Sequence, residues 1–229
     1  MTFVAIVAFT VLLILPSTPV FAAKCSASAN PGVNWSDCRK RNIILTRSDL
    51  SGATLQGTDF SATDLSRSQM GGSDLTKATI VRASFAGTYA DNAVFERSVG
   101  SRTNFQEASL KSATFYKAEM PRANFTGAAL NDVNFDHSDL GRADFTDADI
   151  TGTRFEFSIL ARADLRGSRF EGPIDFTGAY FFLTRIEGVD LSAAEGLAQW
   201  QIDMACGDDD TKLPDGVSRP GSWPCSMDW

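Results

Sequence analysis

The sequence is poor in the residues that enzyme and metal sites most often use. Its 229 residues include one histidine, His137, three tyrosines and four cysteines. A single histidine excludes a histidine-rich metal site. His137 lies between Asp136 and Ser138, but neighbouring residues of an extended strand point to opposite faces, so the three do not form a catalytic triad. We interpret His137 as a solvated surface residue.

Several motifs of catalysis and metal binding are also missing. The sequence has no glycine-rich phosphate loop, no H-E-x-x-H pair, no nucleophile elbow and no C-x-x-C spacing. We therefore predict a protein that is not an enzyme, with no catalytic, cofactor-binding or metal-binding residues and no small-molecule substrate. The net charge of −7 disfavours nucleic acid as a partner and, with 43% hydrophobic residues, suits one soluble domain.

The sequence does have a strict period of five. A large apolar residue occupies every fifth position from Leu45 to Phe170, and only Ala90 and Gly100 break the series. A helix repeats its apolar face at about 3.6 residues and a strand at about 2, so neither fits. A coil that turns one corner per five residues does fit, with successive turns roughly 4.8 Å apart.

If four sides close a turn, residues twenty apart are vertical neighbours, with Phe105 on Phe85 and Phe125 on Phe105. Sorting the series by twenty then places nearly all of its phenylalanines in two alternate columns. The two columns are Leu45, Leu65, Phe85, Phe105, Phe125, Phe145, Leu165 and Leu55, Leu75, Phe95, Phe115, Phe135, Phe155. A period of ten would explain the alternation equally well.

The units ANFTG, ADFTD and ADLRG resemble the pentapeptide repeat family, whose consensus is A-(D/N)-L-x-x. The resemblance covers 45–191 and implies an all-β fold, a right-handed quadrilateral parallel β-helix, over that range. The segment from Ala205 to Trp223 also resembles the carboxy-terminal part of bacterial members. Members of one fold family serve many functions, so the resemblance does not assign an activity.

Residues 1–22 are interpreted as a secretory signal peptide. The apolar run FVAIVAFTVLLIL is followed by V-F-A, a small-x-small pattern that predicts cleavage after Ala22. Only the amino terminus supplies a positive charge before the run, so a retained anchor helix is the alternative, although the run is short for a span of about 20 residues. Cleavage predicts a periplasmic or secreted protein.

Export would place the four cysteines in an oxidising compartment, where they can pair in three ways. Proximity in the sequence favours Cys25 with Cys38 and Cys206 with Cys225, each pair closing a short loop at one end of the coil. A zinc site is the alternative, but no histidine lies near any of the four.

The segments outside the repeat are predicted to cover the ends of the coil. Residues 23–44 are assigned to an amino-terminal cap in which Trp35, Ile43 and Ile44 cover the first turn. Residues 192–229 are assigned to a short helical cap and a disulfide-closed tail.

Three local features accompany these assignments. Ser192 and Glu195 stand in the spacing of a capping box that would begin the helix. The series slips by one residue after Phe170. Tyr89 and Val99 are expected to fill the gaps that the two small interruptions leave in the core.

Basic residues recur every twenty residues at two corner positions. The first corner carries Arg82, Arg102, Arg122, Arg142 and Arg162, and the second carries Lys77, Arg97, Lys117 and His137. In a four-sided coil the arginines form a vertical row at about 4.8 Å per turn, a candidate strip for an extended anionic partner such as an acidic polysaccharide, a lipid head group or an acidic protein face. Alternatively they pair with carboxylates such as Asp144 and Asp164, each exposed pair contributing little.

The resulting hypothesis is an exported, non-enzymatic binding or structural module for an unknown protein or an extended anionic partner. The family resemblance implies an alternative, because some members are acidic mimics of duplex DNA that bind DNA gyrase and protect it from quinolone drugs. Export and the arginine row argue against this alternative. The resemblance also allows an end-to-end homodimer.

Overall fold

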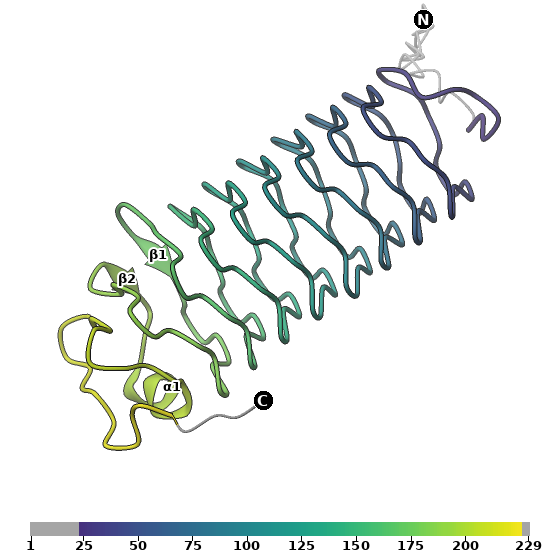
Figure 1. The fold of residues 1–229 in the computed structure, drawn as a ribbon. Coiled ribbons are helices and arrows are strands. Elements are labelled where there is room, and N and C mark those ends of the chain that lie inside the picture. The colour runs from purple at the N-terminus through teal and green to yellow at the C-terminus, as the bar shows by residue number, and fades with distance from the viewer. Residues whose placement is uncertain (1–22, 226–229) are drawn as a thin grey trace, which may run out of the picture.

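The computed structural model describes residues 23–225, which form a coil whose turns are stacked in a single row (Figure 1). Each turn pairs with the next through parallel β-bridges between residues twenty apart, from Asn34 with Thr54 to Asp149 with Arg169. A turn therefore consists of four pentapeptides. The architecture is a parallel β-helix, which confirms the all-β solenoid predicted from the period.

Three elements of the described chain are longer than a single bridge or turn. They are β1 (Ile174–Asp175), β2 (Ala194–Glu195) and α1 (Gln199–Met204). β1 and β2 pair in parallel and so continue the pairing of the coil (Figure 1). Over residues 23–225 no helix is long and apolar enough to cross a membrane. The predicted signal peptide, residues 1–22, lies outside the described residues.

The interior of the coil is built from the large residue of each pentapeptide and the small residue two positions before it. Phenylalanines twenty apart stack on one another, and the ring centroids of Phe105 and Phe125 are 5.0 Å apart with planes 1° from parallel. Phenylalanines ten apart, such as Phe115 and Phe125, meet edge to face at 5.9 Å. Both geometries are favourable for aromatic pairs. The prediction that residues twenty apart are vertical neighbours is confirmed.

Each corner is a tight turn closed by one backbone hydrogen bond. At one corner the Ala83 N–H donates to the Ile80 carbonyl at 3.0 Å, and Arg82, the third residue of the turn, has φ = 56°. This left-handed conformation usually favours glycine, yet long side chains occupy the equivalent position at many corners. The repeat therefore fixes where a corner side chain lies, while the sequence decides its chemistry.

The aspartates and asparagines that precede the large residue support these corners. The Oδ1 atom of Asp144 accepts a hydrogen bond from the Thr146 N–H at 2.9 Å, and the same bond recurs at other corners. The side chain thereby satisfies a backbone donor at the start of the turn. This role explains the many aspartates of the repeat without invoking a catalytic carboxylate pair.

The carboxylate hydrogen bonds predict that the protein loses stability in acid. Lys212 and then Ser192 lower the pKa of Asp190 to about 2, and Ser51 lowers the pKa of Asp49. A group with a lowered pKa in the folded state stabilises the fold above its unfolded pKa, about 3.9, and loses that contribution as the pH falls through its folded pKa. We therefore expect the free energy of unfolding in urea to be steady from about pH 7 to 5 and to fall between about pH 4 and 2.

The variant Asp190→Asn provides the control for this titration. Its side-chain oxygen can still accept from Ser192 but the group cannot titrate, so the fall in stability below about pH 4 should be shallower than in the natural protein. A free energy of unfolding that stays constant to about pH 2 would contradict the prediction.

The interruptions of the apolar series are not filled by their chain neighbours, and that prediction is wrong. Tyr89 and Val99 occupy outward positions and are exposed. At Gly100 the space is taken from the turns on either side, because a Cβ atom there would lie 2.3 Å from Met120 Sδ and 3.0 Å from Ile80 Cγ1. Thr103 Oγ1, on the same turn, would lie 2.8 Å from the same Cβ atom. Alternation along the strand points Val99 outward, so the gap is filled by Thr103 and by the residues twenty apart.

The coil begins earlier than predicted. Asn34 already pairs with Thr54, and Trp35 is buried at an inward position. Residues 34–44 therefore form part of the first turn rather than a separate cap. Ile44, which was expected to cover that turn, occupies an outward position and is 80% exposed.

The register changes by one residue after Phe170, as the sequence predicts. Arg154 pairs with Asp175, twenty-one residues further on, and Ile159 pairs with Tyr180 in the same new register. The coil continues beyond the change into β2.

The carboxy-terminal helix begins later than predicted. Ser192 and Glu195 do not cap it, because Glu195 belongs to β2. α1 starts instead after Ala198, whose N–H donates to Gln201 Oε1 at 2.7 Å. The side-chain Nε2 of the same glutamine donates to the carbonyl oxygens of Phe176 and Ala179 at 2.9 and 3.0 Å, so α1 lies against the last turns of the coil.

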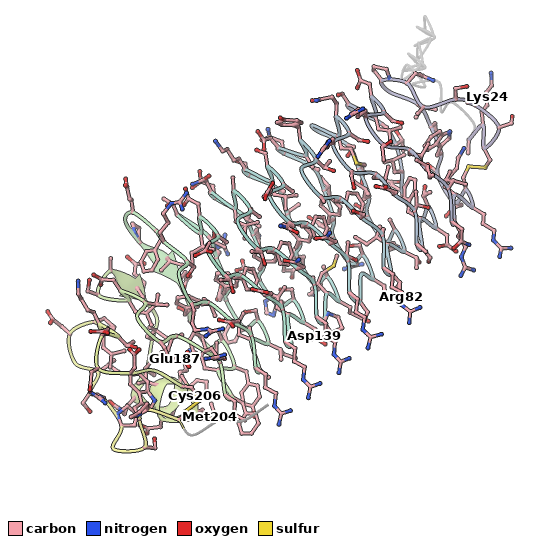
Figure 2. The ribbon with its side chains drawn as sticks, in the orientation of Figure 1. Lys24, Arg82, Asp139, Glu187, Met204 and Cys206 are labelled. Carbon is pink, nitrogen blue, oxygen red and sulfur yellow. A yellow bond between two sulfur atoms is a disulfide. The ribbon has the colours of Figure 1, made fainter. Side chains whose placement is uncertain are left out.

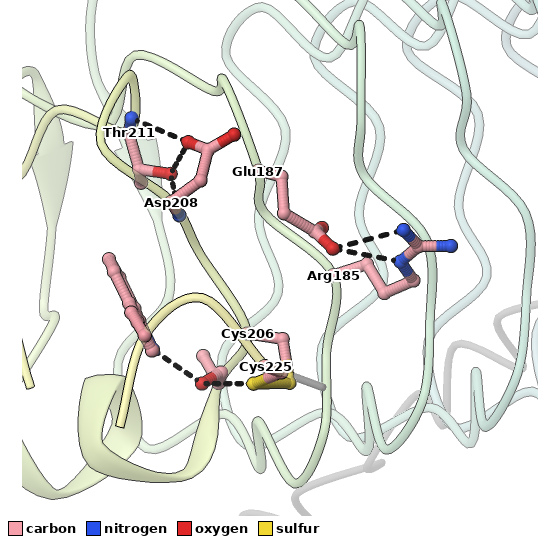
Figure 3. The surroundings of a disulfide bond; sticks show 8 residues. Arg185, Glu187, Cys206, Asp208, Thr211 and Cys225 are labelled. Carbon is pink, nitrogen blue, oxygen red and sulfur yellow. Dashed lines mark hydrogen bonds and ion pairs between the residues drawn. A yellow bond between two sulfur atoms is a disulfide. The ribbon is translucent and has the colours of Figure 1, made fainter. Parts of the chain in front are cut away.

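One disulfide lies at each end of the described chain. Cys25 pairs with Cys38 and Cys206 with Cys225, with Cα atoms 5.4 and 5.5 Å apart, as their sequence proximity predicts. Figure 3 shows the second disulfide, between Cys206 and Cys225. The carbonyl of the preceding residue, Ala205, accepts a hydrogen bond from the buried Trp223 indole at 2.7 Å. The tail is thus held to the coil by a covalent and a polar contact.

Candidate functional site

The arginines predicted to align do share one corner of the coil, which we call the arginine row. Its members are Arg82, Arg102, Arg122, Arg142 and Arg162, all with φ between 56° and 60°. The N–H of each donates to the next turn, as from Arg102 to the Pro121 carbonyl at 3.0 Å. Neighbouring members are therefore separated by about one rise of 4.8 Å. Figure 2 shows the Arg82 side chain pointing away from the coil.

Four members of the arginine row lack an acidic partner. Among residues 23–225, no ion pair involves Arg82, Arg102, Arg122 or Arg142. Asp164, one of the carboxylates that could have neutralised the row, binds Arg166 at 2.7 Å instead. The flanking turn positions Ser101, Pro121 and Gly141 are uncharged. These four guanidinium groups therefore remain available to an anion.

The second basic corner is also formed as predicted. It carries Lys77, Arg97, Lys117 and His137, with φ between 54° and 59°. His137 is exposed, and its ring stacks on Phe157 at 5.4 Å and meets Tyr116 edge to face at 5.6 Å. These contacts place His137 between two aromatic side chains.

The side between the two corners is not uniformly basic. Its outward column runs through Val99, Glu119, Asp139 and Ile159, which are joined by consecutive β-bridges. Glu119 is exposed and Asp139 half-buried. The basic charge is thus confined to the corners, and the arginine row is the part that forms a continuous line.

The sequence reading did not identify a cluster of exposed apolar side chains at the carboxy-terminal end of this same side. We call it the apolar patch; its members Phe157, Ile159, Tyr180 and Phe182 are 53%, 44%, 43% and 41% exposed. Ile159 and Tyr180 are bridged neighbours, and the rings of Tyr180 and Phe182 stack at 6.2 Å. The signal was present in the sequence as large apolar residues at outward and corner positions, where other turns carry polar ones.

The ring of Phe157 completes the apolar patch by covering Gly178. A Cβ atom at Gly178 would lie 2.5 Å from Phe157 Cδ1. The absence of a side chain at Gly178 therefore leaves room for the Phe157 ring, which comes from the preceding turn. Gly178 is two residues before Tyr180, just as Phe157 is two residues before Ile159. The four apolar side chains therefore occupy two adjacent turns.

A buried carboxylate, Asp136, lies close to these surfaces but is fully engaged. Burial raises its pKa, while the Arg154 guanidinium and the Glu156 N–H, 3.0 Å from Oδ1, act in the opposite direction. Both oxygens of the carboxylate are used in these contacts. Asp136 therefore supports a corner, and within residues 23–225 no group of three His, Cys, Asp or Glu side chains is placed to hold a metal ion.

The geometry defines the class of protein as a β-helical solenoid built from five-residue units. A family model described as pentapeptide repeats matches in eight copies over residues 43–80, 81–115, 108–147 and 138–174. The chain belongs to the pentapeptide repeat family. The family consists generally of non-enzymatic structural or binding proteins.

Solved structures of pentapeptide repeat proteins match the chain at low sequence identity. HetL, a pentapeptide repeat protein involved in heterocyst differentiation regulation in Nostoc sp. strain PCC 7120, is 19% identical over 82% of this chain and 86% of its own, with a TM-score of 0.41. Full-length QnrB1, a plasmid-mediated fluoroquinolone resistance protein, is 14% identical over 80% of this chain and 92% of its own, with a TM-score of 0.36. No curated protein sequence matches the chain significantly.

Proposed function

We propose that the protein is an exported, non-enzymatic binding module that holds an extended anionic partner along the arginine row. The proposal includes the right-handed, four-sided form of the β-helix and the role of α1 as a cap on its last turn. The proposal is carried by four aligned guanidinium groups that form no ion pair among residues 23–225. Arginine is well suited to this task because its planar, permanently charged fork binds carboxylate, sulfate or phosphate oxygens in pairs.

The arginine row is a basic surface on a protein that is acidic overall. The whole chain has a net charge of −7, yet its aspartates are largely used inside the coil's own corners. Uncharged residues beside the row limit internal competition for it. A linear polyanion that follows the coil axis could contact one arginine per turn, whereas a compact anion could reach only one or two.

The test compares two variants with the same change in charge. Arg102→Asn with Arg122→Asn removes the second and third members of the row and so interrupts it. Arg47→Asn with Arg67→Asn removes two stacked arginines from a different corner, where φ is also positive. Asparagine tolerates this conformation, so folding should be preserved. We expect the first variant to elute from a polyanion resin at clearly lower salt than the second. Equal elution of both variants and the natural protein would rule out the row as the binding site.

Export is the second part of the proposal, and it is supported by the apolar run and small-x-small pattern of residues 1–22. Mass spectrometry of the mature protein should find an amino terminus at Ala23. A mature protein that starts at Met1 would instead favour the alternative of an acidic DNA mimic acting on DNA gyrase. That alternative requires a continuous negative surface, which the arginine row interrupts.

A further inference from the structure

The apolar patch lies where two columns of polar or charged side chains change character. Along the second basic corner, Lys117 and His137 are followed by Phe157. Along the outward column, Asp139 is followed by Ile159 and Tyr180. An exposed apolar cluster with a polar rim is typical of a protein interaction site. The change occurs at the carboxy-terminal end of the coil. Along the coil axis, a basic surface is therefore followed by an apolar surface.

The arginine row ends beside the apolar patch. Arg162 is its last member, and the corner residue of the following turn is Leu183, with φ = 55°. The Arg162 N–H donates to the carbonyl oxygen of Phe182, a member of the patch, at 2.8 Å. A single ligand lying along the axis would therefore meet the arginines first and the patch next.

We propose that this combined surface binds an acidic amphipathic helix of a protein partner, with an apolar end on the patch and an acidic stripe on the arginine row. This inference rests on the proposed function and specifies its partner. Carboxylates at i, i+3 and i+4 of a helix recur at about 5.4 Å per turn, close to the rise of about 4.8 Å between arginines. The row spans about 19 Å over its four intervals, which a helix of about 13 residues covers.

The apolar patch favours such a helix over an acidic polysaccharide. A polysaccharide that is charged along its whole length and follows the row past Arg162 would place anionic groups over Phe182 and Leu183, where they would lose water without gaining a hydrogen bond. A helix can carry leucine or phenylalanine at that point, and burial of the four exposed apolar side chains then stabilises the complex. The patch therefore selects a partner whose charge stops where the arginine row stops.

The experiment uses the full mature chain and two labelled helical peptides in fluorescence anisotropy titrations. The first peptide carries glutamates at i, i+3 and i+4 spacing followed by a turn of leucines, and the second has serines in place of the leucines. Ile159→Thr with Tyr180→Thr removes half of the patch, and threonine already occupies the outward position at Thr79 and Thr114. The control is Tyr89→Thr, at an outward position on another side that is more exposed than Ile159 or Tyr180.

The patch variant is expected to bind the leucine peptide about tenfold more weakly than the natural protein and to bind the serine peptide equally well. Tyr89→Thr should change neither affinity, and the Arg102→Asn, Arg122→Asn variant should weaken both. Equal binding of the two peptides by the natural protein would overturn this inference while leaving the anionic site intact.

Labelled polygalacturonate serves as the third probe. If it binds more tightly than the leucine peptide and is weakened by the patch variant, the partner is a polysaccharide and the inference is overturned. If neither the peptides nor polygalacturonate bind at low salt, both the proposed function and this further inference fail. Circular dichroism of each variant confirms that a loss of binding is not a loss of the fold.

Discussion

Replacement of Phe115 by alanine is expected to lower the free energy of unfolding by about 3–5 kcal/mol. Phe115 lies between Phe95 and Phe135, with ring centroids 4.6 and 4.9 Å away, and also meets Phe105 and Phe125 edge to face. Its side chain is completely buried. Removal of the ring would leave a cavity on the coil axis, and the neighbours cannot close it because the rise between turns is fixed by backbone hydrogen bonds.

The matched control is Phe115→Leu. Leu75 occupies the same column two turns earlier and is equally buried, so this position of the coil accepts leucine. We expect a loss below about 1.5 kcal/mol. Urea denaturation of both variants provides the measurement. Similar losses for alanine and leucine would contradict the prediction, because they would show that ring-to-ring contacts, and not the filling of the interior, stabilise the coil at this position.

Removal of the carboxy-terminal disulfide, by Cys206→Ser with Cys225→Ser, is expected to lower the free energy of unfolding by about 3 kcal/mol. The two cysteines are nineteen residues apart, and the bond restricts this loop in the unfolded chain. The tail should also detach more readily, because only the Trp223 side chain and a few polar contacts would hold it to the last turns.

The amino-terminal pair provides the comparison. Cys25 and Cys38 are thirteen residues apart, so loop entropy predicts a slightly smaller loss for their double serine variant. Hydrogen exchange should become faster in residues 207–223 for the first variant only. Unchanged exchange there, with unchanged stability in urea, would contradict the role assigned to the Cys206–Cys225 bond.

The interior of the coil could be predicted because one rule repeats. The five-residue period sets which side chains point inward, and the phenylalanine columns indicate that Phe105 lies on Phe85. The arginine row follows from the same arithmetic, since Arg82 and Arg102 have identical positions in their units. Both predictions depend only on spacing, which the sequence displays directly.

The structure departs from the prediction where the five-residue spacing does not determine which side chains are in contact. Gly100 is compensated by Met120 and Ile80 from adjacent turns, a contact that chain neighbours do not reveal. α1 begins at Gln199 because Gln201 can bond both to the helix start and to the last turns of the coil, which a local capping pattern does not show. The apolar patch joins residues of two adjacent turns across the change of register, so no single five-residue unit displays it.

The pairing of each residue with its counterpart twenty positions on has a consequence for the size of the protein. Excision of residues 103–122 would join Arg102 to Ala123, which occupies the same place in its unit as Thr103, and would bring Phe85 onto Phe125. The remaining side chains would keep equivalent neighbours, except that Leu140 would take the place of Met120 beside Gly100. The molecule would become one rise shorter, about 4.8 Å. Its length is thus adjustable in whole turns, so that evolution or an engineer can match it to the length of whatever it holds.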